Sequence, residues 1–214
     1  MTRRRLIVPA LLAALLLPAA VADAKPRSCT RGGATLEEAS GKVRVVRRKL
    51  KTQSAQETRR EGLSACWAPT GRRFRVATEQ DFGDDLISRT SVQIVDERYV
   101  GVVLTGEGGV SIGVTASVFD ARKAKRLHRS KACDADDDDF RGPDDVAFLP
   151  RGGMAFSCGA LFYFRTAATK TAQQLEPATA GARQLGVSTR ADGFFDRLYW
   201  TLADGTVKSL DLEP

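Results

Sequence analysis

Short runs of apolar and β-branched residues recur along most of the chain, separated by turn-forming residues. Ser91–Val95 alternates polar and apolar side chains, which is the period of a half-buried strand. Five more runs have the length and the aromatic or β-branched content of strands: Tyr99–Leu104, Ile112–Phe119, Val146–Leu149, Leu161–Phe164 and Leu198–Leu202. Almost no stretch keeps a helical period over ten positions. The pattern therefore predicts an all-β fold.

Two segments near the N-terminus depart from this pattern. Thr35–Ala39 has the composition of one helical turn, and Lys49–Arg60 is polar enough to be a loop or a frayed helix. We expect both to be minor exceptions to the strand pattern.

Glycine-containing turns connect four pairs of strand-like runs and indicate a repeat. The turn glycines are Gly71, Gly108, Gly152 and Gly205, at spacings of 37, 44 and 53 residues. A four-stranded propeller blade has a repeat of about 40 to 50 residues. The spacing predicts antiparallel four-stranded repeat units in a small or irregular β-propeller-like arrangement. A β-sandwich with long loops is the alternative, because hairpins at this spacing also suit a sandwich.

Two of these segments resemble parts of secreted bacterial β-propeller-like repeat proteins. In Ser117–Leu127 a strand ends in the pair Phe119-Asp120 and turns through a basic segment, as the outgoing strand pair of those proteins does. Val146–Phe156 resembles the inner hairpin of the next blade. The resemblance extends over Leu63–Leu212, is one of pattern, and lacks the Gly-His and Trp-Asp signatures of the best-known repeat. It implies a fold and no particular activity.

The first residues have the pattern of an export signal. Three arginines precede the apolar run Leu6–Ala22, and the small-residue site Ala22-Asp23-Ala24 follows it. Pro9 and Pro18 interrupt the run, which favours a cleaved signal over a retained membrane anchor. We therefore expect a secreted or outer-cell-surface protein with no membrane span after cleavage.

Composition and charge refine this division of the chain. The 214 residues are 43% hydrophobic and 28% charged, which excludes a collagen, a coiled coil or a multi-span membrane protein. We expect a signal peptide at 1–24, a basic segment with the first strand at 25–62, and the β-repeat domain at 63–214. Residues 25–75 hold 14 Lys or Arg and 4 Asp or Glu, whereas residues 76–214 carry a net negative charge.

All four cysteines follow the signal, and an even number in an exported chain suggests two disulfides. Of the three possible connectivities we favour the pairing of neighbours, Cys29 with Cys66 and Cys133 with Cys158. A structural zinc site is the alternative, but its ligands come in close pairs such as C-x-x-C, and none occurs here.

The basic segment offers a candidate anion-binding face. Its candidate residues are Arg44, Arg47, Arg48, Arg59 and Arg60, with Arg72, Arg73 and Arg75 further along the chain. The expected ligand of this face is an anionic wall polymer or a membrane surface, and a surface protein is a further possible partner of the whole protein. Nucleic acid is not expected, because stacking aromatics are few here and an exported protein does not meet intracellular DNA or RNA. A solvated arginine-rich surface is the alternative.

Gly109–Gly113 matches the G-x-S-x-G pattern of a hydrolase nucleophile, with Ser111 in the central position. A strand-like run follows Ser111 where a hydrolase has a helix. The only histidine, His128, is surrounded by Lys and Arg, which disfavour its protonated form. We expect a glycine-rich hairpin and a surface histidine here, and no catalytic residue.

An acidic run offers weak calcium candidates. Asp134, Asp136, Asp138 and Asp145 have a spacing similar to that of an EF-hand loop, but Asp139 stands where the loop needs glycine and the last ligand is not glutamate. A solvated loop explains the run equally well. No metal or other cofactor is therefore predicted.

These observations favour a non-catalytic binding or scaffolding protein at the outer cell surface. An extracellular hydrolase acting on a wall polymer and an anionic-polymer-binding protein are the alternatives. Phosphate-cradling glycine motifs are missing, which disfavours nucleotide chemistry.

Overall fold

The computed structural model describes residues 28–83, 87–108, 111–130, 143–189 and 195–212. Within these ranges the chain forms β-strands and two short 3-10 turns, Pro150–Gly152 and Ala178–Ala180, with no α-helix. The first eight strands are β1 (Thr35–Ser40), β2 (Val43–Lys49), β3 (Arg59–Trp67), β4 (Arg72–Asp81), β5 (Ile87–Val95), β6 (Tyr99–Gly108), β7 (Ser111–Asp120) and β8 (Lys125–Arg129). The others are β9 (Asp145–Leu149), β10 (Gly153–Cys158), β11 (Ala160–Phe164), β12 (Gln173–Glu176), β13 (Arg183–Thr189), β14 (Phe195–Thr201) and β15 (Val207–Asp211). The prediction of an all-β antiparallel fold is confirmed.

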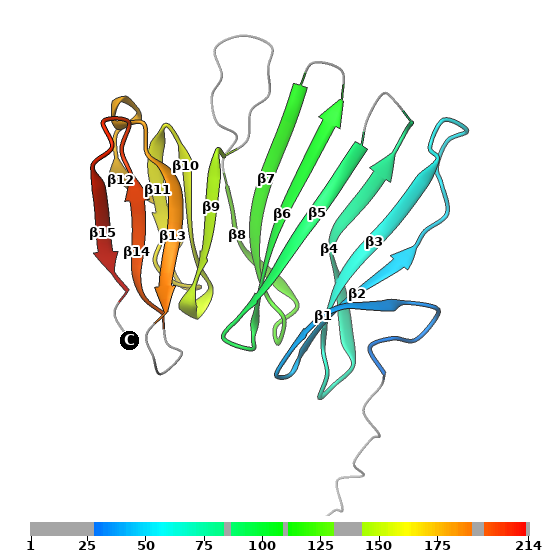
Figure 1. Cartoon of the computed structure of the whole chain (residues 1–214). Coiled ribbons are helices and arrows are strands. Elements are labelled where there is room, and N and C mark those ends of the chain that lie inside the picture. Colours follow the sequence, from blue (N-terminus) through cyan, green and yellow to red (C-terminus); the bar gives the residue numbers. More distant parts are fainter. Residues whose placement is uncertain (1–27, 84–86, 109–110, 131–142, 190–194, 213–214) are drawn as a thin grey trace, which may run out of the picture.

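Consecutive strands pair in antiparallel fashion to give sheets β1–β8, β9–β12 and β13–β15. The β4 and β5 strands pair only at Asp81 and Ile87, so the eight-stranded sheet divides there into two halves. We call β1–β4 the first sheet, β5–β8 the second, β9–β12 the third and β13–β15 the fourth. The four stand side by side like an open fan (Figure 1).

Each gap between neighbouring sheets is filled by apolar side chains. Valines and leucines of the first sheet, such as Val45 and Leu63, pack with Val100 and Phe119 of the second. Tyr99 and Val118 on the other side of the second sheet belong to a cluster with Phe148 and Phe156 of the third. Leu161 and Tyr163 of the third sheet pack with Leu198 and Trp200 of the fourth. Two-sided burial of the inner sheets explains why their strands are rich in apolar residues.

The first strand of each sheet lies against the first strand of the next, since β1 contacts β5, β5 contacts β9, and β9 contacts β13. The strand pairing among the described residues links no strand of the first sheet to the fourth. Among these residues no closure of a ring is detected, and the stacked sheets fit a sandwich or an irregular β arrangement.

The four glycine turns do join antiparallel strands, but at different places in their sheets. Gly71 joins β3 to β4, the last two strands of the first sheet, whereas Gly152 lies between β9 and β10, the first two strands of the third. The uneven spacing of these glycines follows, because the hairpins are not equivalent copies. Gly71 and Gly205 have φ angles of +62° and +85°, which only glycine adopts readily.

The helical turn expected at Thr35–Ala39 is wrong, because the segment forms strand β1. Five residues are too few to make a stable isolated helix. Pairing with β2 satisfies their backbone groups, and a shift in register between Leu36 and Glu38 accommodates one extra residue. The polar segment that follows β2 is a loop, and β3 begins at Arg59.

Strand β3 crosses the boundary expected between residues 62 and 63 and pairs with β2 from Trp67 to Glu61. The basic segment is thus part of the first sheet. Within the described ranges, no helix is long and apolar enough to cross a membrane. The segment 1–24, expected to be a signal peptide, lies outside the described residues.

Candidate functional site

The outer side of the first sheet, which faces away from the second sheet, is rich in arginine. Side chains alternate between the two sides of a strand, and the inner side is marked by core residues such as Val45 and Leu63. Applied to the register of β2, β3 and β4, this alternation brings five arginines to the outer side. We call these residues, Arg44, Arg48, Arg60, Arg73 and Arg75, the arginine face.

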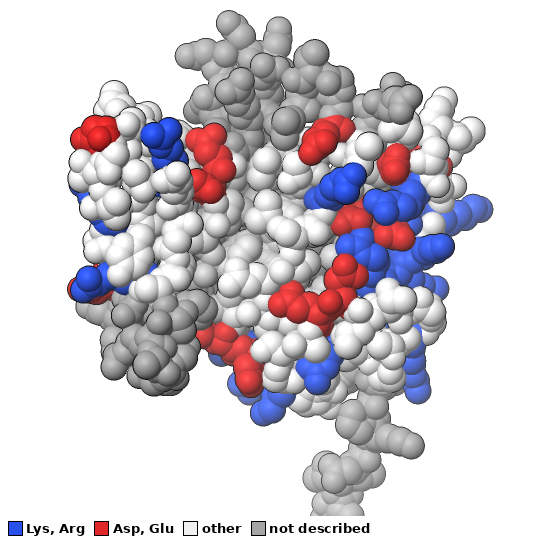
Figure 2. All heavy atoms as spheres, in the orientation of Figure 1, with Lys and Arg blue, Asp and Glu red and all other residues white. Residues whose placement is uncertain are grey.

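The strand register places these arginines close together. Arg44 and Arg73 lie opposite Cys66 on its two sides, and Arg48 lies opposite Gly62. Neighbouring strands are about 4.8 Å apart, so the five side chains share a patch only three strands wide. Figure 2 shows Lys and Arg side chains gathered on the right of the molecule, where the first sheet lies.

The positive charge of this face is only partly neutralised. Of the five arginines, Arg60 is the one with a carboxylate within 4.0 Å in the described ranges, because its Nε lies 3.7 Å from Glu57 Oε1. Arg44 donates to the backbone carbonyls of Gly41 and Val43, both at 2.7 Å. Among the described residues, no carboxylate lies within 4.0 Å of a side-chain nitrogen of Arg48 or Arg75. These two guanidinium groups are available to an external anion.

A disulfide between Cys29 and Cys66 ties residues 28–34 to the arginine face. Arg73 Nη1 donates to the carbonyls of Cys29 and Arg31, at 3.3 and 2.9 Å. Arg73 of the arginine face is therefore hydrogen-bonded to backbone carbonyls of residues 28–34. The pairing predicted for these two cysteines is confirmed.

The other predicted bridge involves Cys133 and Cys158. Cys158 is disulfide-bonded, and Cys133 lies outside the described residues.

Two of the five predicted anion-binding residues, Arg47 and Arg59, lie on the inner side of the first sheet. Arg47 contacts Glu37 at 3.0 Å, Glu61 at 3.1 Å and also Glu79. Arg59 approaches Glu61 and Glu79 at 3.9 and 3.7 Å. The hydrogen bond to Glu37 raises the pKa of Arg47 most, followed by those to Glu79 and Glu61, and together they outweigh burial. These carboxylates neutralise both arginines.

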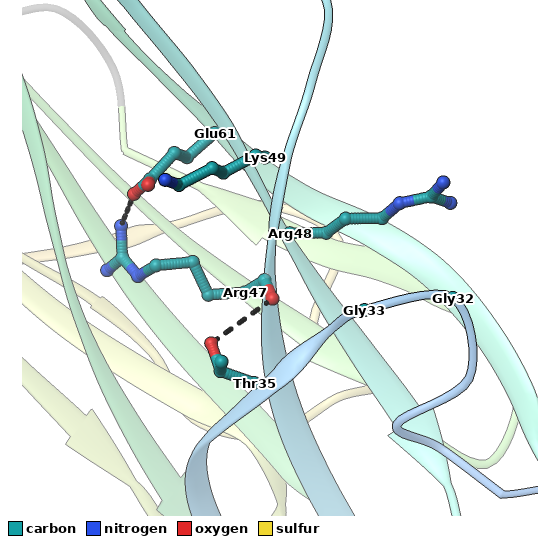
Figure 3. A pocket seen from close by; sticks show the side chains of 7 residues that line it. All are labelled: Gly32, Gly33, Thr35, Arg47, Arg48, Lys49 and Glu61. Atoms are coloured by element: carbon teal, nitrogen blue, oxygen red, sulfur yellow. Dashed lines mark hydrogen bonds and ion pairs between the residues drawn. The ribbon is translucent and has the colours of Figure 1, made fainter.

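A cleft of about 360 Å³ opens at the edge of β2, beside the arginine face. It is lined by Gly32, Gly33, Thr35, Arg47, Arg48, Lys49 and Glu61. Figure 3 shows Arg47 directed toward Glu61, while Arg48 extends to the opposite side of the strand. The cleft is thus lined both by Arg47, which is neutralised by carboxylates, and by Arg48, which has no carboxylate partner among the described residues.

In the sequence the candidate arginines are neighbours along the chain. In the structure, the side of the sheet that each one occupies follows from the alternation of side chains along its strand. Arg44, Arg48 and Arg60 share the outer side with Arg73 and Arg75, and Arg72 lies opposite the inward-facing Trp67. The alternation of side chains in β2 is enough to assign Arg47 and Arg48 to opposite sides of the sheet. The strand partners were needed to add the arginines of β4.

The serine and the histidine singled out in the sequence have different settings. Ser111 is the first residue of β7 and lies opposite Gly108 in a hairpin, so no helix follows it. The expectation of a surface histidine is wrong, because His128 is only 4% exposed. Its ring stacks on Phe164, and Nε2 lies 2.9 Å from the carbonyl oxygen of Thr166. Burial lowers the pKa of His128, against the opposing effect of backbone hydrogen bonds.

Three of the weak calcium candidates, Asp134, Asp136 and Asp138, lie outside the described residues. The fourth, Asp145, accepts the backbone N–H of Gln184. In the part of the chain that the structure describes, no three His, Cys, Asp or Glu side chains are grouped to hold a metal ion.

The sequence matches no protein-family model, and a comparison with curated proteins finds no relative. The support for a function of this protein therefore comes from the geometry of the arginine face.

Proposed function

We propose that the protein is an exported, non-catalytic binding protein that holds an anionic polymer of the cell surface on the arginine face. The observation that carries the proposal is the pair Arg48 and Arg75, two cations on one sheet face without a carboxylate partner in the described structure. Guanidinium groups bind phosphate and carboxylate through paired N–H donors. A polymer with repeated charges can contact several of the five arginines at once, and such contacts reinforce one another.

Export is supported by two independent features. The basic and apolar start of the chain has the order of a signal peptide. The Cys29–Cys66 disulfide is a type of bond that persists in oxidising compartments outside the cytosol. An anionic polymer of the cell surface is therefore the polymer that the protein would meet.

The architecture proposed for this function is an open arc of β-propeller type. Its support is that each of the four sheets is an up-and-down meander and that the first strands contact one another in succession. In such an arc the outer side of an end sheet has no neighbouring sheet to cover it. The first sheet is an end sheet, and on its outer side Arg48, Arg73 and Arg75 are exposed to a long ligand, whereas Arg44 and Arg60 are partly buried.

The test measures retention of the mature protein on an immobilised polyanion at physiological salt. Arg48→Gln with Arg75→Gln is expected to weaken binding about tenfold or more, because two charge-assisted contacts are lost. Arg122→Gln with Arg126→Gln is the matched control, since both residues are exposed, in the β7–β8 turn and in β8, and their loss removes the same charge. Equal loss in the two double variants would mean that net charge alone causes retention and would refute the proposal.

A further inference from the structure

We propose that residues 28–34, which the Cys29–Cys66 disulfide ties to the first sheet, are part of the anion-binding site. In this site Arg31 is a sixth arginine that contacts the bound polymer, and the carbonyl groups of Cys29 and Arg31 orient Arg73 toward it. The inference rests on the proposed function and adds residues that determine how strongly the polymer is held.

The disulfide brings residues 28–34 onto the outer side of the first sheet. Cys66 is completely buried and lies in β3 between Arg44 of β2 and Arg73 of β4. From Cys29 the chain reaches β1, which pairs with the opposite edge of β2, so residues 28–34 cross the outer side of β2. Val46 lies on that side of β2 and is only 2% exposed, which agrees with this path of the chain.

Two side chains of the arginine face contact the tied residues. Arg73 Nη1 donates to the carbonyl oxygens of Cys29 and Arg31, at 3.3 and 2.9 Å. The Cζ of Arg48 lies 3.7 Å from the place that a Cβ on Gly32 would occupy. Residues 28–34 and the arginine face therefore form one continuous surface.

The hydrogen bonds to the two carbonyl groups use a single nitrogen of Arg73. A guanidinium group has five N–H donors in a rigid plane, so a group held through Nη1 keeps Nη2 and Nε for an external anion. Within the described ranges neither of these two nitrogens donates to a protein acceptor, and Arg73 is exposed. A side chain that is already held in place loses less conformational freedom when it binds a ligand, which strengthens binding.

Arg31 adds a positive charge at the same place. It is exposed, and no carboxylate of the described residues lies within 4.0 Å of its side-chain nitrogens. The hydrogen bond from Arg73 to its carbonyl keeps the backbone of Arg31 beside the arginine face. A polymer that contacts Arg73 therefore meets Arg31 as a neighbouring cation, and the two contacts reinforce one another.

The first experiment removes the disulfide and the added cation, separately and together. Affinity for linear polyphosphate of defined length is measured by titration of the mature protein at physiological salt. Arg31→Gln is expected to weaken binding about fivefold while the disulfide is present, because one charge-assisted contact is lost. In the variant Cys29→Ser with Cys66→Ser the same substitution should weaken binding less than about twofold, because the released segment no longer holds Arg31 at the face.

Arg122→Gln is the matched control for charge, because Arg122 is exposed and lies in the β7–β8 turn. Equal effects of Arg31→Gln and Arg122→Gln would overturn the inference, and so would equal effects of Arg31→Gln with and without the disulfide. Binding by the wild-type protein would leave the proposed function standing in both cases. Absence of binding by the wild-type protein would overturn the proposed function itself.

The second experiment keeps both the charge and the disulfide. In Arg73→Lys a single nitrogen must serve the carbonyl groups and the polymer together, so affinity for polyphosphate should decrease about threefold to fivefold. Arg129→Lys, at an exposed position of β8, is the matched control. Thermal melting shows whether each variant is folded, and Arg73→Lys tests the inference even if the protein without the disulfide fails to fold. Wild-type affinity in Arg73→Lys would overturn the inference.

Discussion

The carboxylate of Asp145 in the third sheet accepts the backbone N–H of Gln184 in the fourth sheet, and Gln184 has a φ angle of +54°. A hydrogen bond of the same kind joins the second sheet to the third. The carboxylate of Asp96 accepts the backbone N–H of Arg151, which has a φ angle of +55°. Between the first and second sheets, Glu38 accepts the N–H of Ile94 at 3.3 Å. At each interface a carboxylate of the earlier sheet thus holds the backbone of the next.

These contacts predict a specific cost of removing one carboxylate. Asp145→Ala is expected to lower the free energy of unfolding by about 1 kcal/mol, because a hydrogen bond from a backbone N–H to a charged acceptor is lost near the surface. Asp145→Asn retains an acceptor oxygen and should lose less. Chemical denaturation measures both. Asp211→Ala is the control, because its exposed ion pair with Arg197 contributes little; an equal effect of the two alanine variants would contradict the prediction.

The contact between Gly101 and Phe148 offers a second prediction. A Cβ on Gly101 in β6 would collide with the ring of Phe148 in β9, which packs directly on the strand. Gly101→Ala is therefore expected to lower the free energy of unfolding by about 1 to 3 kcal/mol through overpacking.

The same substitution in a Phe148→Leu background should cost less, because the smaller side chain leaves room for the methyl group. A double-mutant cycle by denaturant unfolding measures this coupling. Additive effects of the two substitutions would show that the collision is not the cause.

Loss of the first disulfide should be costly. In the chain-entropy model, a bridge that spans 37 residues contributes about 3 to 4 kcal/mol. Cys29→Ala with Cys66→Ala should lower the free energy of unfolding by that amount and release residues 28–34 from the arginine face. Denaturant unfolding measures the first effect, and protease cleavage within residues 28–34 measures the second. An unchanged midpoint would show that the bridge contributes nothing to stability.

His128 predicts a dependence of stability on pH. Burial lowers its pKa in the folded state, so the unfolded chain takes up the proton first as the pH falls. Stability is full above the ordinary pKa of histidine, about 6.5, and decreases as the pH falls from there toward the folded pKa. One proton gives a slope of at most about 1.4 kcal/mol per pH unit.

His128→Phe keeps the stacking on Phe164 and removes the titration. The wild-type protein should lose stability between pH 7 and 5 relative to this variant, as measured by denaturation at several pH values. Asp120 does not contribute in this window: its burial opposes ionisation, but hydrogen bonds from Arg98 and the backbone of Lys123 lower its pKa below 3.8. Parallel pH profiles for wild type and variant would contradict the role given to His128.

The sequence predicts local features of this fold better than long-range ones. The alternation in Ser91–Val95 and the five other strand-like runs coincide with strands β5, β6, β7, β9, β11 and β14, because such runs reflect the buried sides of sheets. The sequence does not predict a strand at Thr35–Ala39, because the strand character of this segment depends on pairing with β2. It does not predict the burial of His128 for a similar reason: the charged neighbours along β8 are exposed, whereas the ring stacks on Phe164 of another sheet.

The candidate site was predicted in part. The sequence shows the concentration of arginine near the N-terminus, and the pairing of Cys29 with Cys66 belongs to the connectivity favoured among the three that the sequence allows. The division between the outer Arg48 and the neutralised inner Arg47 depends on strand partners that are far apart in sequence, such as Glu79. The distribution of charged residues along the chain does not show which carboxylates lie next to which arginines in the folded sheet.

The stacking of the sheets has a mechanical consequence. The apolar cluster between the first two sheets shares no residue with the cluster between the last two, and each sheet is held mainly by its immediate neighbours. A molecule stretched between its two ends would therefore lengthen in separate steps as the end sheets peel away, while the middle of the stack stays intact.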